Sequence, residues 1–484
     1  MNFNSGIFLI YLPIVVLVYW LLPHRARKVW LLLASYFFYM YWNPVLIVLL
    51  LFSTAVDYLC GRGMERYSES RVKKRALLLL SVCMNLGLLF FFKYWDFFAD
   101  NTDRLCAALS IPYSVPKLGL ILPVGISFYT FQTMSYTIDV YRGDFKAEKD
   151  PITFALYVTF FPQLVAGPIE SPQNLLPQLK AEHRFNTDDF QAGIKLLLSG
   201  FFRKCVVADL CGIFVNSVFN SADTANGFAV IIAGSLFCFQ MYCDFAGYSE
   251  IAQGAARLMG VRLMKNFDRP YISQSYGEFF RRWHISLNRW FTSYVYIPLG
   301  GGRRGLARKI LNTFIVFSLC GLWHGARWTY VLWGLYAAFW VSFESLVLKK
   351  LESFAKKHGA DLESPVVKLI RRGYMFLIFI PAALIFRSSS LEQLGTVFSR
   401  LFTGGFSLTE GLASLGMSGY SILQLALTLV AMAKLPEILT HPFPASLTRM
   451  ERIVRCVYIV LIIAFCWLAL LQTKDAASFA YFQF

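Results

Sequence analysis

Long apolar runs separated by short basic loops are the feature that most constrains this chain. The first run, residues 7–22, is followed at once by His24, Arg25, Arg27 and Lys28, and comparable runs recur along the chain. An apolar stretch of about 20 residues can cross the hydrocarbon core of a bilayer, and a helix satisfies its own backbone hydrogen bonds there. The sequence therefore predicts an all-α polytopic membrane protein.

The composition agrees with this class. Hydrophobic residues make up 57% of the chain and charged residues 15%, whereas soluble domains average about 45–50% apolar and roughly 25% charged residues. The net charge of +17 is carried largely in short loops between apolar runs, a pattern typical of positive-inside topology. We therefore expect membrane lipids, and no nucleic acid, among the partners. The ten cysteines form no C-x-x-C pair and no zinc-like cluster with histidine, so no metal site is indicated.

The runs predict twelve spans in a single membrane domain, residues 1–472. Basic loops such as 62–75 and 349–372 are expected in the cytoplasm, which places both termini outside. The stretch with Asp96, Asp100 and Asp103 is expected to be an outer loop. The spans are expected near residues 7–22, 29–43, 45–61, a stretch ending at about Lys93, 118–138, 192–218, 226–243, 309–323, 328–347, 373–387, 419–437 and 455–472.

One apolar segment is too short and too broken to span comfortably. Residues 154–169 contain Pro162, Gly167 and Pro168. Irregular backbone at membrane depth is tolerated where protein buries it or where it lines a cavity. We therefore expect a re-entrant segment that shapes the mouth of a pocket.

Residues 240–260 combine small and polar side chains at helical spacing. Asp244, Tyr248 and Glu250 within this stretch cannot face lipid cheaply. They are expected to face the protein interior or the cytoplasm, and Asp244 and Tyr248 are candidate substrate-binding residues.

His324 is the first candidate catalytic residue, because an ionisable group in an apolar environment is by default a functional-site hypothesis. It follows Trp323, a candidate substrate contact, and Gly321 and Gly325 leave room for a substrate to approach. Burial disfavours the imidazolium, so the ring is expected to stay neutral and to serve as a general base. The alternative is a structural histidine hydrogen-bonded to a backbone carbonyl.

His284 lies in the basic and aromatic segment RRWHISLN, with Asn288 one helical turn later on the same face. Together these two residues can orient a carbonyl or hold the catalytic base, and Arg281 and Arg282 are candidate substrate-binding residues. The alternative is an amphipathic interfacial helix anchored by Arg and Trp. Two histidines lack the three-ligand set of a catalytic zinc site, so none is predicted.

The turn after this segment is rich in glycine and basic residues. Gly300 and Gly301 precede Arg303 and Arg304, and such a turn on the cytoplasmic side can receive a phosphorylated ligand. Basic turns are also common at membrane faces. The sequence has no G-x-S-x-G elbow and no P-loop, so it does not support a hydrolase or an ATPase.

The end of the chain is unusually aromatic. Residues 473–484 are expected to form an extracytoplasmic tail that ends in FAYFQF. An exposed apolar tail is unfavourable in water, so we expect it to fold back into a groove. Tyr481 is its strongest candidate nucleophile, and the alternative is an interfacial aromatic anchor.

Five segments together resemble the membrane-bound O-acyltransferase family, and in particular the bacterial branch with alginate O-acetyltransferase and the teichoic-acid D-alanine transferase. The run RRWHISL followed by YIPLGG and WHG at this spacing is highly specific. The segments are FFPQLVAGPIE (160–170), YCDFAGYSEIA (242–252), NFDRPY (266–271), FFRRWHISLNRWFTSYVYIPLGG (279–301) and GLWHGA (321–326).

The resemblance implies a ring of about 11–12 transmembrane helices with re-entrant segments and a central tunnel. His324 would be the catalytic histidine midway along the tunnel, and His284 matches the second histidine of the family pattern. The family moves an acyl group from a cytoplasmic thioester, here acetyl-CoA or an acyl-carrier protein, to an acceptor hydroxyl. No bound cofactor is implied.

The tail resembles the C-terminal aromatic motif of some Gram-positive members or of a small partner protein. This resemblance implies that Tyr481 takes the acyl group and relays it to an extracellular SGNH-type transferase or esterase partner, which places it on a polysaccharide. Residues 292–299 lack the charged pair that relatives of the alginate enzyme carry before YIPLGG. Together with the tail, this departure favours a Gram-positive-type envelope polymer over alginate.

The leading hypothesis is therefore an O-acetyltransferase in a bacterial plasma membrane. One alternative is acylation of a lipid or protein acceptor within the membrane, which predicts a dispensable tail. The other is a carrier of acylated lipid or glycan without covalent chemistry, in which glutamine could replace His324.

Overall fold

The computed structural model describes residues 1–165, 167–359, 361–440 and 448–472. Helices are its regular elements, and no strand occurs within these ranges, which confirms the all-α class. The chain divides into two compact units, residues 1–197 with 249–264, and residues 198–248 with 265–484. The division falls inside two helices, α10 (Thr187–Phe201) and α12 (Gly227–Leu258).

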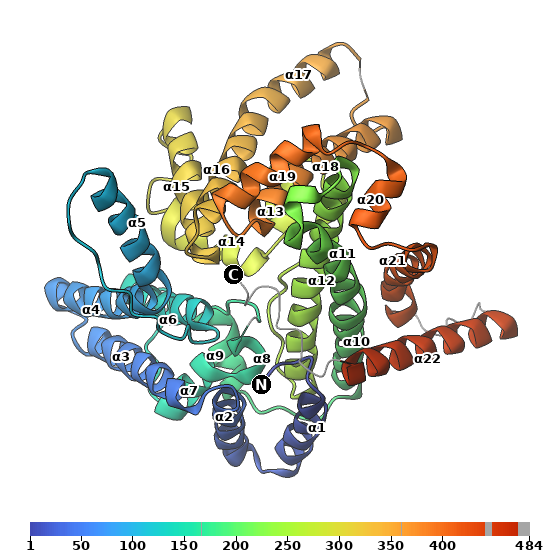
Figure 1. Ribbon diagram of the computed structural model, residues 1–484. Coiled ribbons are helices and arrows are strands. Elements are labelled where there is room, and N and C mark those ends of the chain that lie inside the picture. Colours follow the sequence, from blue (N-terminus) through green and yellow to red (C-terminus); the bar gives the residue numbers. More distant parts are fainter. Residues whose placement is uncertain (166, 360, 441–447, 473–484) are drawn as a thin grey trace. The chain divides into compact units, whose positions relative to one another are not determined.

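The first unit begins with a succession of helices and short helical turns (Figure 1). In chain order they are α1 (Gly6–Leu21), α2 (His24–Met40), η1 (Pro44–Leu46), α3 (Ile47–Arg66), α4 (Arg71–Leu89), η2 (Phe90–Tyr94), α5 (Trp95–Ala108), α6 (Ile126–Arg142), α7 (Pro151–Thr159), α8 (Phe161–Leu164) and α9 (Pro172–Lys180).

The second unit holds the two candidate histidines. Besides α12, its elements are η3 (Phe202–Ala208), α11 (Asp209–Asn220), η4 (Ala222–Thr224), η5 (Pro270–Ile272), α13 (Tyr276–Arg282), α14 (Ile285–Phe291), η6 (Thr292–Tyr296), α15 (Leu306–His324), α16 (Trp328–Phe343), η7 (Glu344–Leu348), α17 (Lys349–Lys357), α18 (Pro365–Arg387), α19 (Leu391–Thr403), α20 (Leu408–Ser414), α21 (Gly419–Thr440) and α22 (Arg449–Gln472).

Several helices are long and apolar enough to cross a membrane, so the chain is a multi-pass membrane protein. Among the described residues six stretches qualify, and the pair α20–α21, bent by 77°, would make a seventh. Twelve spans were expected, and the difference arises partly because helices such as α1, with 16 residues, are short. The six stretches are Pro44–Arg66, Arg71–Ala108, Gly227–Leu258, Leu306–His324, Trp328–Lys357 and Pro365–Arg387.

Two expected boundaries were wrong. The helix that was to end near Lys93 continues through η2 and α5 to Ala108, so the aspartates expected in an outer loop lie on a helix. The span expected over 118–138 begins instead at Ile126, because Gly125 precedes it with a φ of +77°, a left-handed conformation that favours glycine. In α5, Asp96 accepts hydrogen bonds from the backbone N–H groups of Leu118 and Gly119, which holds the intervening loop against the helix.

Other local expectations were confirmed. The tight connection at Asn43 is present, and the Asn43 side chain accepts a hydrogen bond from the N–H of Val45 at 3.0 Å. The segment over 154–169 does not form a single span, because α7 ends at Thr159 and the short helix α8 follows.

A third expected boundary was wrong. The span expected to end at residue 243 is instead part of the continuous helix α12.

Helices α3, α4 and α6 of the first unit pack against one another around a buried polar cluster (Figure 1). Asp57 is fully buried and accepts hydrogen bonds from Ser81 Oγ at 2.5 Å and from Asn85 Nδ2 at 3.0 and 2.9 Å. Ser53 and Thr133 donate to Asn85 Oδ1 at 2.9 and 3.3 Å. The cluster satisfies its buried polar groups internally, as a membrane-embedded core requires.

In the second unit, α15 and α16 form a closely packed pair. A Cβ atom added to Gly321 would clash with the carbonyl oxygen of Tyr330, and one added to Gly334 would clash with that of Phe317. Small residues allow membrane helices to approach at backbone distance. This close approach fixes the end of α15, where His324 lies.

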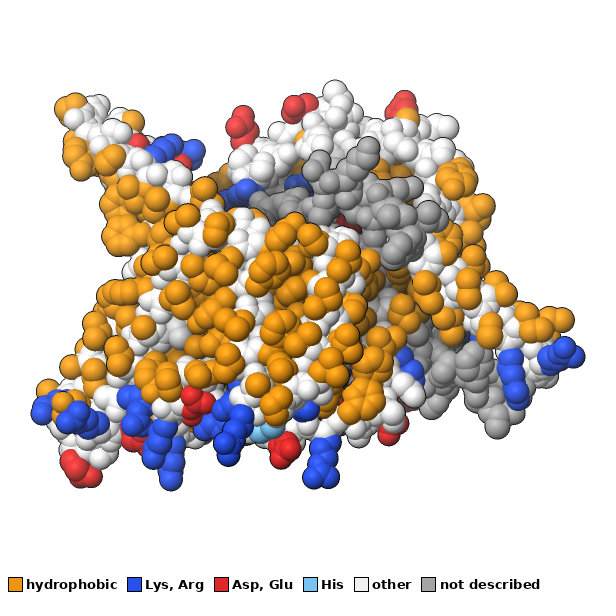
Figure 2. Space-filling view, turned by 90° about the horizontal axis from the view of Figure 1, so that it is seen from below, with side chains coloured by type: hydrophobic (Ala, Val, Ile, Leu, Met, Phe, Trp, Pro, Cys, Tyr) orange, Lys and Arg blue, Asp and Glu red, His pale blue; other side chains and the backbone are white. Residues whose placement is uncertain are grey.

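Apolar side chains are widely exposed on the candidate spans, for example Leu59 at 65% and Leu377 at 71%. Figure 2 shows many apolar side chains on one face, with Lys and Arg gathered along one margin of them. Water does not favour exposure of this extent, whereas lipid does. The exposed surface therefore agrees with a membrane-embedded chain.

Candidate functional site

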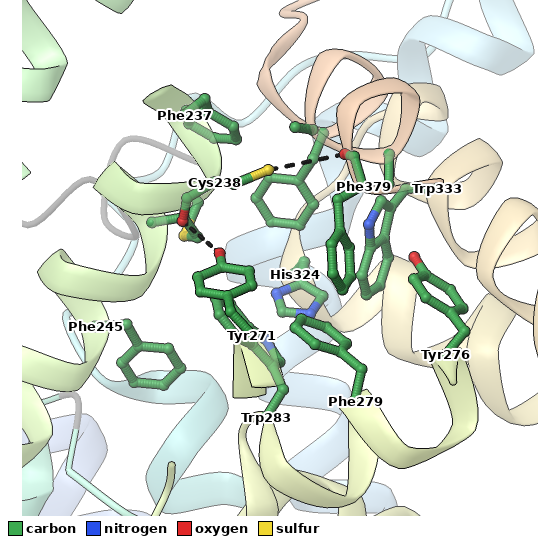
Figure 3. A pocket seen from close by; sticks show the side chains of 14 residues that line it. Phe237, Cys238, Phe245, Tyr271, Tyr276, Phe279, Trp283, His324, Trp333 and Phe379 are labelled. Atoms are coloured by element: carbon green, nitrogen blue, oxygen red, sulfur yellow. Dashed lines mark hydrogen bonds between the residues drawn. The ribbon is translucent and has the colours of Figure 1, made fainter. Parts of the chain in front are cut away.

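His324 is the last residue of α15, and its side chain lines a cavity in the second unit. The residue is 7% exposed. Figure 3 shows its imidazole at the centre of a set of aromatic side chains. The lining consists of Phe237, Cys238, Met241, Phe245, Tyr271, Tyr276, Phe279, Trp283, His324, Trp333, Phe379, Ala382, Ala383 and Phe386.

Aromatic rings hold the imidazole of His324 edge to face. The ring centroids of Trp333 and Phe386 each lie 5.2 Å from that of His324, with interplanar angles of 86° and 79°. Hydrogen bonds fix part of the wall: Tyr271 donates its hydroxyl to the carbonyl of Cys238 at 2.5 Å. Side chains locked in this way keep a functional group in one orientation.

A second cavity is also lined by His324. Trp283, His324 and Trp333 line both cavities, so the imidazole is accessible from each of them. The second lining consists of Phe280, Trp283, His284, Leu287, Asn288, Phe291, Val316, Phe317, Cys320, His324 and Trp333. The two candidate histidines therefore share one cavity.

His284 occupies the corner between α13 and α14 in a strained backbone conformation. Its φ of +43° is left-handed, which is uncommon for a residue other than glycine. The segment that begins at Asn266 holds this corner. The N–H of Ile285 donates to the Asn266 carbonyl at 2.9 Å, and Ser286 Oγ donates to Asn266 Oδ1 at 2.6 Å. Strain that the surrounding structure maintains in this way is typical of functional sites.

The ring of His284 is enclosed by aromatic side chains. Its centroid lies 4.6 Å from that of Phe245 and 5.7 Å from that of Trp323, whose own centroid lies 5.3 Å from His324. Burial, with a smaller contribution from the nearby His324, lowers the pKa of His284 well below its ordinary value. The ring is therefore neutral near pH 7 and can donate one N–H.

The structure places the other residues of the RRWHISLN segment in different environments. Asn288 lines the second cavity, and its side-chain amide donates to the carbonyl of Phe280. Arg282 pairs with Glu278 at 2.9 Å and with Asp268 at 3.4 Å. Arg281 is exposed, and neither arginine belongs to the described lining of the two cavities.

Asp244 and Tyr248 are each 1% exposed, which confirms that they face the protein interior. Asp244 forms an ion pair with the buried ammonium of Lys204 at 2.7 Å, and Lys204 also pairs with Asp209 at 2.9 Å. Asp244 and Tyr248 are absent from the described lining of both cavities. Asp244 nevertheless precedes Phe245, which contacts His284.

Gly300 and Gly301 lie in a turn with φ values of +100° and +56°. A hydrogen bond joins the turn to α15: Asn312 Nδ2 donates to the Gly301 carbonyl at 2.9 Å. Among the described residues that line the two cavities, neither of these glycines occurs. Tyr481, the candidate acyl acceptor, lies outside the described residues.

Sequence reasoning missed much of the wall around His324. Phe379 and Phe386 come from α18, which contains none of the motifs, and Tyr271 comes from the NFDRPY segment. Cys320, which the sequence analysis did not name as a candidate, also lines the second cavity. Its position four residues before His324 was the signal that could have identified it, because such residues share a helix face.

Comparisons with known proteins point to one family. The protein-family model described as "MBOAT, membrane-bound O-acyltransferase family" matches residues 34–379 of this chain. A Pseudomonas aeruginosa protein named "Probable alginate O-acetylase AlgI" is 35% identical over 440 residues, covering 90% of this chain and 81% of that protein. A Helicobacter pylori peptidoglycan O-acetyltransferase is 34% identical, covering 69% of this chain and 68% of that protein. A Bacillus subtilis teichoic acid D-alanyltransferase is 30% identical, covering 46% and 59% respectively.

Proposed function

Because this chain belongs to the membrane-bound O-acyltransferase family, we propose that it is an O-acetyltransferase that acts on a cell-envelope polysaccharide with His324 as its general base. The observation that carries this proposal is the position of His324, whose buried imidazole lines two cavities. A base in this position can contact an acceptor hydroxyl in one cavity while the donor carbonyl enters from the other.

The proposed step is direct acyl transfer assisted by a general base. His324 takes the proton of the acceptor hydroxyl, and the hydroxyl oxygen attacks the carbonyl carbon of an acetyl thioester. The carbon–sulfur bond then breaks, and the imidazolium returns the proton to the departing thiolate. His284, kept neutral by burial, would donate its N–H to the carbonyl oxygen as negative charge develops there.

The names of the relatives support an acetyl group and a polysaccharide acceptor. The relatives named for O-acetylation of alginate and peptidoglycan match larger shares of this chain than the D-alanyltransferase does. The donor would be a cytoplasmic thioester, either acetyl-CoA or an acetylated carrier protein. We propose that the protein resides in a bacterial plasma membrane with both termini outside.

A relay would complete the transfer. Tyr481 would accept the acetyl group from the thioester, with His324 as its base, and pass it to an extracellular SGNH-type partner that modifies the polysaccharide. The support for this step is the aromatic ending FAYFQF. If the acceptor is instead a lipid or protein in the membrane, the tail is dispensable.

The role of His324 can be tested with purified protein in lipid vesicles. Radiolabelled acetyl-CoA is supplied with alginate oligosaccharides or peptidoglycan fragments, and ester formation is measured for wild type, His324→Ala and His324→Gln. Loss of a positioned base should lower the rate by about 10²- to 10⁴-fold. His358→Ala is the matched control, because His358 is an exposed histidine in the turn after α17. A wild-type protein that forms no ester, but moves an acetylated glycan or lipid across the vesicle membrane as well as His324→Gln does, would favour a carrier without covalent chemistry.

The relay has its own test. Peptide mapping after incubation with labelled acetyl donor should locate acetyl on Tyr481 in wild type, and Tyr481→Phe and His324→Ala should abolish it. An unmodified tail in a protein whose activity still depends on His324 would reduce the tail to an anchor. Deletion of residues 478–484 without loss of activity would favour a lipid or protein acceptor.

A further inference from the structure

A thiol shares the second cavity with His324. Cys320 lies one helical turn before His324 in α15, so the two side chains project from the same helix face. Cys320 Sγ is 3.8 Å from His324 Nε2, and both residues line the second cavity. A nucleophile beside its base in a cavity is the arrangement required for covalent catalysis, and these distances are often loose before substrate binds.

The other cysteine that lines a cavity is placed differently. Cys238 lines the larger cavity, but its thiol donates to the carbonyl of Phe379 at 3.8 Å. Among the described residues, Cys320 is the cysteine that combines a place in the cavity lining with close approach to the His324 ring. The geometry therefore distinguishes this thiol from the other cysteines of the chain.

The inference rests on the proposed function and adds a step to it. We propose that Cys320 carries the acetyl group as a thioester before the group reaches the acceptor hydroxyl. His324 removes the thiol proton, the Cys320 sulfur attacks the acetyl carbonyl, and the bond from that carbon to the donor sulfur breaks. The donor thiolate leaves with the proton held by His324.

The second half returns the enzyme to its starting state. His324 deprotonates the acceptor hydroxyl, whose oxygen attacks the acetyl carbon on Cys320. The new oxygen ester leaves, and the proton returns to the Cys320 sulfur. The first exchange replaces one thioester by another, and the second replaces a thioester by a more stable ester, so neither half needs a further reactant.

The surroundings of Cys320 favour a protected intermediate. Leu287, Phe291, Val316 and Phe317 line the same cavity, so much of its wall is apolar. Exclusion of water limits hydrolysis of a reactive acyl group. A covalent carrier also allows the donor thiol to leave before the acceptor arrives.

The test uses Tyr481→Phe protein in vesicles without acceptor, so that acetyl accumulates on the first nucleophile. Labelled acetyl-CoA and an acetylated acyl-carrier protein serve in parallel as donors, and peptide mapping locates the label. We expect label on Cys320 approaching one per chain, released by neutral hydroxylamine as a thioester. In protein that retains Tyr481, the label on Cys320 should be discharged at least as fast as turnover once the acceptor that works in the activity assay is added.

Variants supply the controls. Cys320→Ala should abolish the label and lower acetyl transfer by roughly a hundredfold or more, the scale of losing one positioned group. Cys320→Ser should hold label as an ester that neutral hydroxylamine does not release. Cys211→Ala should behave as wild type, because Cys211 is buried in α11 and absent from both described linings.

The outcomes separate this inference from the proposed function. Acetyl transfer at the wild-type rate in Cys320→Ala, or transfer by wild type without label on Cys320, would overturn the intermediate and leave the acetyltransferase proposal intact. A wild-type protein that transfers acetyl to no acceptor and to neither Cys320 nor Tyr481 would overturn both. The position of the label is measured in protein that retains Cys320. Misfolding of a Cys320 variant would therefore not affect whether the intermediate is detected.

Discussion

The protein buries polar side chains in two contrasting ways. In the first unit, Asp57, Ser81 and Asn85 hydrogen-bond one another between α3, α4 and α6. In the second unit, His284 and His324 lie among aromatic rings and line cavities. The first arrangement joins helices, and the second places two imidazole rings beside cavities that a substrate can enter.

The comparison shows that burial of an ionisable residue in a membrane protein does not by itself mark the site of chemistry. Asp57 is more completely buried than His324, at 0% against 7% exposed, yet it is absent from the described lining of both cavities. A cavity beside the residue is the additional requirement. Four predictions test the distinction between buried structural groups and buried groups beside a cavity.

The largest effect is expected at His324. His324→Ala should lower acetyl transfer by about 10²- to 10⁴-fold, because a positioned base is lost. Its unfolding temperature in detergent should fall less than that of Asp57→Ala, since the removed ring already borders open space. Retained activity together with a large drop in unfolding temperature would make His324 a structural residue like Asp57.

Asp57→Ala should show the opposite behaviour. It removes one acceptor from the side-chain amide of Asn85 and one from the hydroxyl of Ser81, which keep the Ser81 carbonyl and Thr137 Oγ1 as acceptors. The cost is about 0.5–1.5 kcal/mol for each hydrogen bond lost. Thermal unfolding should shift downward, while activity per folded molecule stays near that of wild type. Asp57→Asn keeps one acceptor oxygen and should shift less; a loss of activity in this folded control would contradict a purely structural role.

His284 lies between these two cases, because it combines a strained corner with a place beside the cavity. Asn tolerates the left-handed conformation, whereas Val does not, so His284→Val should be less stable than His284→Asn by about 1–2 kcal/mol. Both variants should lose activity if the imidazole assists the reaction. Wild-type rates in His284→Asn would show that only the backbone corner matters.

The smallest effect is a dependence of stability on pH in the first unit. Burial raises the pKa of Glu170 from 4.5 to about 7, although it accepts hydrogen bonds from Asn174 and from the N–H of Met264. The folded state then binds this proton more tightly than the unfolded state, so the contribution is full below about pH 4.5 and is lost as pH rises through about 7.

Glu170→Gln should flatten this part of the curve. Unfolding temperatures of wild type and Glu170→Gln, measured between pH 5 and 8, should converge at the acidic end and separate at the alkaline end, with wild type the less stable there. Parallel curves would show that the carboxyl group does not titrate in this range.

The fold class was predictable from the amino-acid sequence because membrane helices leave a local signal. Apolar runs identified an all-α membrane protein, and Asn43 marked a tight connection that the structure contains. Helix ends were less predictable. The continuation of α4 through η2 into α5 places Asp96 on a helix, and its carboxylate gains partners from a loop more than 20 residues later, which no local pattern encodes.

The candidate site divides in the same way. His284, Asn288 and His324 could be named from the sequence, since each belongs to a recognisable segment, and the structure places all three on the second cavity. The pairing of Arg282 with Asp268 and of Asp244 with Lys204 could not be foreseen, because these partners come from separate segments of the chain. Tyr481 stays a prediction.

By itself, the sequence determined the class of protein, its family and the two histidines, because hydropathy and motifs are written in consecutive residues. The tertiary structure decided what surrounds those histidines. Close packing of α15 and α16 fixes the end of α15, and α18 supplies Phe379 and Phe386. Such contacts join side chains distant in the chain, so the cavities that make His324 accessible exist only once the helices have packed.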